Sequence, residues 1–170
     1  MPSSVPSPAA HVRSILTSAT LSTWQVKHMV PLQAVLAALN AAKVPFVIAG
    51  AHAIGGYTKK PRATVDIDLV IATRAHKRAV KALREAFPAL IVRDTEVVTR
   101  FIDPRTREAV IDLMKPKDNF LKTIFEHSVA LKLHGQVARI PDLEMAAATK
   151  FAAMVGVYRK HPDKLQDAAD

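Results

Sequence analysis

The fold-deciding stretch of the sequence is Val65-Asp66-Ile67-Asp68-Leu69-Val70-Ile71. Apart from its two aspartates it is apolar and rich in β-branched residues, which predicts a buried strand over residues 65–72. Aspartate is disfavoured in strands, and an uncompensated buried charge is costly, so two aspartates here need a reason. Because side chains alternate across a strand, Asp66 and Asp68 should share one face, with Cα atoms about 6.5 Å apart.

Two carboxylates at this spacing repel each other unless a cation lies between them. A hard divalent ion such as Mg²⁺, or Mn²⁺ in its place, prefers oxygen ligands of this kind. The pattern therefore favours a metal site at Asp66 and Asp68. The alternative is a solvated edge or turn in which each aspartate pairs with a nearby lysine or arginine.

A third aspartate, Asp112, lies in a second apolar run, residues 110–114. If this run forms a strand beside the first, three carboxylates converge, which is the usual number for a two-metal phosphoryl-transfer site. Asp66 and Asp68 would then hold both ions. Asp112 would hold the second ion and could take the proton from an attacking hydroxyl. The alternative is that Asp112 is a lone aspartate of the core or of a sheet edge.

Strand-like and helical segments succeed one another along the chain, which predicts an α+β domain with a mixed sheet and flanking helices. The expected strands are residues 44–49, 65–72, 90–93, 97–102, 109–114 and 137–140. A hairpin turn is expected over residues 103–107. The expected helices are residues 26–42, 74–87, 118–127 and 141–155, with a short helix or turn over 51–57.

The composition of the chain suggests three parts. Residues 1–24 are rich in Ser, Pro and Ala and are expected to form a flexible arm. Residues 25–135 would form the catalytic core, and residues 136–170 a C-terminal helical part. The sequence stops soon after a last helix opens near Pro162, which we interpret as a truncated chain or a fragment.

The charge of the 170-residue chain favours a polyanionic partner. Its net charge of +9 creates a positive field that attracts triphosphates, nucleic acids or acidic proteins. We find no cysteine, no secretory signal and no apolar run long enough for a membrane span, so we expect a cytoplasmic protein without a membrane partner.

Residues before the aspartate strand are candidates for binding phosphate. Gly50 follows a buried strand and precedes a helix start, where exposed N–H groups bind anions, although an ordinary turn has the same pattern. Arg62 and Thr64 lie just before Asp66, and Arg62 is either a phosphate contact or a surface arginine. His52 either hydrogen-bonds the substrate or satisfies the start of a helix.

Taken together, residues 47–53 and 61–70 resemble the signature of the polymerase-beta nucleotidyltransferase superfamily. More narrowly, they are similar to the minimal nucleotidyltransferases of the abortive-infection toxin group. In that signature a glycine, followed by glycine or serine, precedes an aspartate pair, and a third carboxylate lies on a later strand, where Asp112 stands. Here Ala51 occupies the second position, and 14 residues separate it from Asp66.

The resemblance implies a Mg²⁺-dependent nucleotidyltransferase that moves NMP from an NTP to an acceptor hydroxyl on RNA, a protein or a small molecule. It assigns nucleotide binding to the region of Gly50, Ala51, His52, Arg62 and Thr64. Lys150, on a C-terminal helix, would contact phosphate or acceptor, or would simply cover an amphipathic helix. In toxin-like relatives the acceptor is tRNA and an antitoxin protein restrains the enzyme.

Two other functions fit the same residues. One is a catalytically degenerate nucleotidyltransferase-fold module that binds nucleotide, RNA or a partner protein, and the change at Ala51 favours it slightly. The other is an antibiotic-modifying nucleotidyltransferase acting on aminoglycosides.

Overall fold

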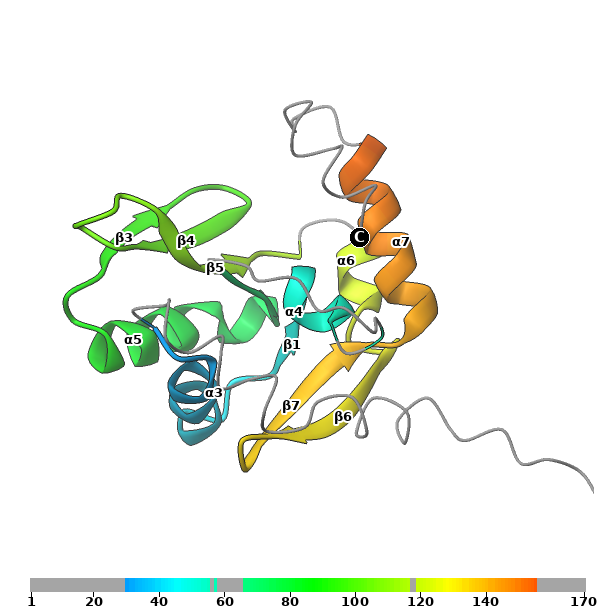
Figure 1. Cartoon of the computed structure of the whole chain (residues 1–170), viewed down its shortest axis with the longest axis horizontal. Coiled ribbons are helices and arrows are strands. Elements are labelled where there is room, and N and C mark those ends of the chain that lie inside the picture. The colour runs from blue at the N-terminus through cyan, green and yellow to red at the C-terminus, as the bar shows by residue number, and fades with distance from the viewer. Residues whose placement is uncertain (1–29, 56, 58–65, 117–118, 156–170) are drawn as a thin grey trace, which may run out of the picture.

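The computed structural model describes residues 30–55, 57, 66–116 and 119–155. The expected arm over residues 1–24 lies outside these ranges, as do Arg62, Thr64 and the helix expected near residue 162. Within them the chain forms a five-stranded sheet and a two-stranded hairpin with helices around them (Figure 1). This is the α+β arrangement with a mixed sheet that the sequence predicts.

The five-stranded sheet has the strand order β1-β2-β5-β4-β3. Strands β2 and β5 are parallel, whereas the pairs β1–β2, β4–β5 and β3–β4 are antiparallel. Its strands are β1 (Phe46–Ile48), β2 (Ile67–Ile71), β3 (Ile91–Asp94), β4 (Val98–Ile102) and β5 (Ala109–Met114). All five expected strands of this sheet are therefore confirmed, to within two residues at each end.

Two helices cover one face of the sheet. Helix α3 (Leu32–Ala41) and helix α5 (His76–Ala86) pack in one cluster with the alternate residues of β2, which are Ile67, Leu69 and Ile71. A 3-10 turn, η1 (Thr73–Ala75), leads into α5, and Thr73 makes no side-chain cap. Because these apolar side chains of β2 point toward α3 and α5, Asp68 must point to the opposite face.

Among the described residues, the other face is covered near β1 and β2. Short helices α4 (Gly50–Ile54) and α6 (Asn119–Thr123) and the longer α7 (Leu143–Val155) lie there (Figure 1). A smaller apolar cluster joins Val47 and Val70 of the sheet to Ile124 and Met145. The side chain of Asp142 accepts a hydrogen bond from Met145 N at 2.8 Å, which caps the start of α7.

The remaining element is an antiparallel hairpin of β6 (Ser128–Leu133) and β7 (Gln136–Pro141). Strand β7 was expected, but β6 was missed, and the helix expected over residues 118–127 is only α6 among the described residues. The signal was present: residues 128–133 alternate in polarity, and His134 and Gly135, both at positive φ, form the turn. The division expected after residue 135 falls in this turn and stays a prediction.

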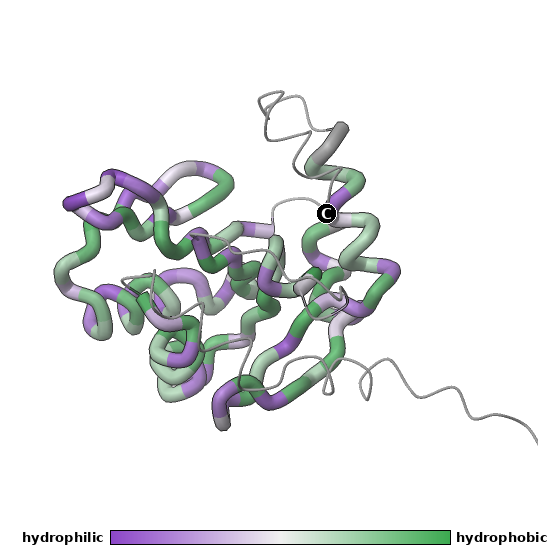
Figure 2. Tube along the Cα trace, viewed as in Figure 1, coloured by the Kyte–Doolittle hydropathy of each residue, from purple (hydrophilic) through white to green (hydrophobic). Residues whose placement is uncertain are grey.

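None of the helices in the described part of the chain combines the length and the apolar character that crossing a membrane requires. Hydrophilic residues concentrate instead in turns such as the one between β4 and β5, which contrasts with the apolar strands beside it (Figure 2).

Candidate active site

The register of the two parallel strands brings the three aspartates together. Asp68 of β2 and Asp112 of β5 are direct Cα partners, and Asp66 lies just before β2. One carboxylate oxygen from each of the three lies within 4.8 Å of the others, and all three side chains are partly buried. The convergence of three carboxylates that the sequence predicts is therefore present, and their role as metal ligands stays a prediction.

Gly50 places the backbone directly against this cluster. It has φ of +59°, and a Cβ atom built on it would lie 2.0 Å from Asp68 Oδ2. Ala49 N donates to the Asp68 carbonyl oxygen at 2.9 Å, which ties the end of β1 to β2 at the same residue. Only glycine allows both the positive φ and this close approach.

The carboxylate of Asp112 is only half satisfied. Its Oδ2 accepts from Arg100 Nε at 3.3 Å, and its buried Oδ1 has no hydrogen-bond partner. Burial raises the pKa of Asp112, the Arg100 charge opposes that rise, and the Asp66 charge adds to it. An unpaired buried oxygen on a carboxylate that lies beside two others fits a divalent cation, because hard cations take oxygen ligands and offset the repulsion.

Sequence reasoning missed the arginines that continue this row across the sheet. Arg100 of β4 is the Cα partner of Asp112, and Arg93 of β3 is the Cα partner of Arg100. Directly paired residues share a face of the sheet, so Asp68, Asp112, Arg100 and Arg93 follow one another on the same side. The expected hairpin turn at residues 103–107 was the available signal, since it fixes the β4–β5 register to within about one residue.

For the other predicted binding residues, the structure shows only the element to which each belongs, or does not describe the residue. Ala51 and His52 belong to α4, directly after Gly50, and Ala51 is buried. Lys150 lies in α7, a helix that contacts α4. Arg62 and Thr64 lie outside the described residues, so their roles stay predictions.

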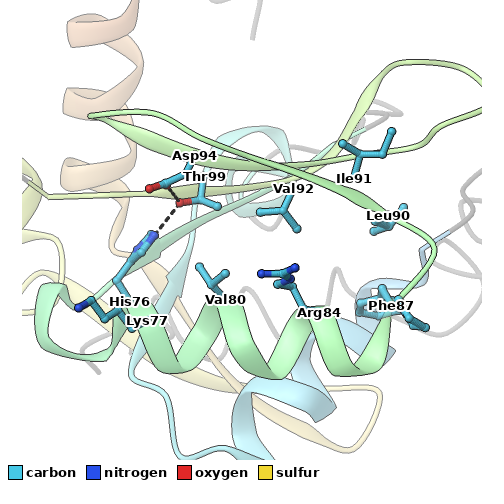
Figure 3. Close-up of a pocket in the computed structure, with 11 residues that line it drawn as sticks. His76, Lys77, Val80, Arg84, Phe87, Leu90, Ile91, Val92, Asp94 and Thr99 are labelled. Atoms are coloured by element: carbon cyan, nitrogen blue, oxygen red, sulfur yellow. Dashed lines mark hydrogen bonds between the residues drawn. The ribbon is translucent and has the colours of Figure 1, made fainter.

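A hollow lies on the opposite face of the sheet. It has a volume of about 600 Å³ and lies between α5 and strands β3 and β4 (Figure 3). Thr99 points into it, and its neighbour Arg100 points to the other side. His76 Nε2 lies 2.8 Å from Thr99 Oγ1, and Thr99 in turn donates to Asp94. This hollow is separate from the candidate site, because the sheet lies between it and the aspartates.

Solved structures share this architecture. No protein-family model matches the sequence, and no curated protein matches it significantly. An antigenic nucleotidyltransferase-like protein from Paracoccidioides brasiliensis is similar over 91% of this chain and 76% of its own, with a TM-score of 0.53 and 18% identity. The antibiotic-resistance factor ANT(2'')-Ia, in its solution structure, is similar over 90% of this chain and 83% of its own, with a TM-score of 0.56 and 15% identity.

A crystal structure of ANT(2'')-Ia in complex with adenylyl-2''-tobramycin gives a TM-score of 0.55 at 14% identity, over 87% of this chain and 86% of its own. At such identities the likeness establishes the fold alone. The chain therefore has the polymerase-beta-like nucleotidyltransferase fold, and a carboxylate cluster that could bind a metal lies on its sheet.

Proposed function

We propose that this protein is a metal-dependent nucleotidyltransferase that moves NMP from an NTP to an acceptor hydroxyl. The observation that carries the proposal is the convergence of Asp66, Asp68 and Asp112, with carboxylate oxygens within 4.8 Å of one another, on a nucleotidyltransferase fold. Three clustered carboxylates repel one another, and a bound cation offsets that repulsion. Metal binding therefore explains the cluster better than a chance arrangement does.

Asp66, Asp68 and Asp112 would hold Mg²⁺ or Mn²⁺. When bound, the cation neutralises charge on the triphosphate and on the leaving pyrophosphate. Asp112 accepts the proton of the acceptor hydroxyl, and its raised pKa suits a base. The acceptor oxygen then bonds to the α-phosphorus as the bond between the α-phosphorus and the bridging oxygen breaks, and pyrophosphate leaves.

The nucleotide would lie on the β1 side of the aspartates. Gly50 begins α4 just after β1 and lies directly against the Asp68 carboxylate, so its backbone is placed to approach the triphosphate. Ala51 and His52 follow it, and Arg62, Thr64 and Lys150 complete the proposed nucleotide-binding set. We further propose, from the sequence resemblance alone, that the enzyme is toxin-like and that an antitoxin protein restrains it.

The test is transfer of label from each of the four α-³²P nucleoside triphosphates, with Mg²⁺ or with EDTA, to total RNA, to the protein itself and to tobramycin. Label on an acceptor that depends on the metal and is lost in Asp68→Asn supports the enzyme. Metal-dependent nucleotide binding in calorimetry without transfer to any acceptor favours the degenerate binding module. Label on tobramycin alone favours the antibiotic-modifying function.

A further inference from the structure

We propose that Arg93 and Arg100 form an acceptor track that binds the phosphates of a nucleic-acid chain, and that the acceptor is therefore a nucleic acid. This inference rests on the proposed function for the position of the acceptor. It adds the class of acceptor and two residues that select it.

The two arginines lie on the side of Asp112 away from Gly50. The cross-strand partners Asp68, Asp112, Arg100 and Arg93 form one row over β2, β5, β4 and β3. Gly50 lies against the Asp68 end of this row, which is where the triphosphate is placed. The acceptor must approach the proton-accepting Asp112 from elsewhere, and the row continues toward Arg100 and Arg93. With strands about 4.8 Å apart, Arg93 lies about 10 Å from Asp112.

Both guanidinium groups are exposed and have N–H groups available for a ligand. Arg100 contacts Asp112 through Nε only, at 3.3 Å, and its side chain is 48% exposed. Arg93 is exposed and has no hydrogen bond or ion pair to any residue in the described part of the chain. Guanidinium N–H groups in this state suit phosphate oxygens, which they bind in a two-pronged geometry.

The charges of the two arginines are both positive and lie on neighbouring strands. Two positive charges on neighbouring strands match an acceptor with repeated negative charges, as in a phosphodiester chain. They repel a polyamine acceptor such as tobramycin, because like charges disfavour binding. Arg93 lies on β3, the edge strand of the sheet, so a nucleic-acid chain bound there would run toward that edge. The net charge of +9 adds a field of the same sign.

The experiment measures binding of a short fluorescein-labelled single-stranded RNA by anisotropy over a range of salt, without triphosphate. We expect Arg93→Ala to raise the Kd about threefold or more and to reduce the slope of log K against log salt by about 0.7. Arg93→Lys should recover part of the affinity, and Arg93→Glu should lower it further. The matched control is Arg84→Ala, an exposed arginine on α5 on the other side of the sheet, which should change the Kd less than twofold.

Equal effects of Arg93→Ala and Arg84→Ala would overturn the track. The track would also be overturned if Arg93→Ala lowered the affinity for an oligoglutamate peptide as much as the affinity for the RNA. The site would then recognise negative charge rather than a nucleic-acid chain. Because the assay contains no triphosphate, its failure is distinct from a failure of transfer. Transfer with no effect of Arg93→Ala rejects only the track, and an effect on RNA binding without any transfer rejects only the proposed chemistry.

Discussion

Gly50 lies so close to the Asp68 carboxylate that a Cβ atom on Gly50 would lie 2.0 Å from Asp68 Oδ2. One residue therefore begins α4 just after a buried strand, adopts a positive φ and borders the candidate metal site. The position is constrained twice, by backbone conformation and by space, and the two constraints can be measured separately.

We expect Gly50→Ala to destabilise the fold and to weaken metal binding, because the new methyl group must displace the Asp68 side chain. Gly135→Ala in the β6–β7 turn is the matched control: Gly135 also has a positive φ, of +77°, but a Cβ atom there would meet nothing within 4 Å. The control should lose about 1 kcal/mol of unfolding free energy from backbone strain alone. Urea denaturation should show a larger loss for Gly50→Ala, and equal losses would contradict the close contact.

Removing one carboxylate should separate stability from metal binding. In EDTA, Asp68→Asn should be as stable as the parent or more stable, because repulsion among Asp66, Asp68 and Asp112 is relieved. Mg²⁺ at about 100 times its Kd should stabilise the parent by about 2.7 kcal/mol and the variant by much less. Thermal melts with Mg²⁺ and with EDTA measure both effects, and Glu85→Gln on α5 should behave as the parent does. A variant that Mg²⁺ stabilises as strongly as the parent would remove the basis for the metal site.

Acid should weaken the fold through His76. Burial lowers the pKa of His76, the Lys115 charge lowers it further, and Asp94 opposes both. As the pH falls below the ordinary value of 6.5, the unfolded chain therefore takes up a proton before the folded one, and unfolding becomes more favourable. Between pH 7 and 5, the unfolding free energy of His76→Gln should fall less steeply than that of the parent. Parallel slopes in urea titrations at each pH would reject this role.

Arg139 should stabilise the hairpin that flanks β1. Its Nε donates to Ser128 Oγ at 2.8 Å, and its Nη2 donates to the Ser128 carbonyl oxygen at 2.7 Å. A lysine cannot reproduce this two-pronged contact, so we expect Arg139→Lys to lose about 1–2 kcal/mol of unfolding free energy. Lys132→Ala, an exposed change on the neighbouring strand β6, should lose less than about 0.5 kcal/mol. If urea denaturation shows the same small loss for both variants, the contact contributes little.

Local patterns carried much of the prediction. Short apolar runs rich in β-branched residues identified the five strands of the sheet, and the alternation of side chains along a strand put Asp66 and Asp68 on one face. The helix expected over residues 74–87 is present as η1 and α5. The alternation in β6 was overlooked, and residues 128–133 were assigned to no element.

Strand order was beyond the reach of these patterns. Strand β3 follows β2 in the chain, yet β5 is the strand that pairs with β2, and this pairing is what joins Asp112 to Asp68. Any apolar strand can satisfy the backbone hydrogen bonds of β2 by pairing beside it. The choice among them depends on how all the strands and helices pack together.

By itself, the sequence determined the strands, the shared face of two aspartates and a positive charge suited to polyanions, because each follows from local periodicity or from composition. Only the tertiary structure decided which charges meet. Ile102 pairs with Ala109 but Phe101 pairs with Ile111, so an extra residue in β5 shifts the register by one and sets Arg100 opposite Asp112. A bulge of one residue moves a side chain to the other face of a sheet, and nothing in the local pattern marks where it falls.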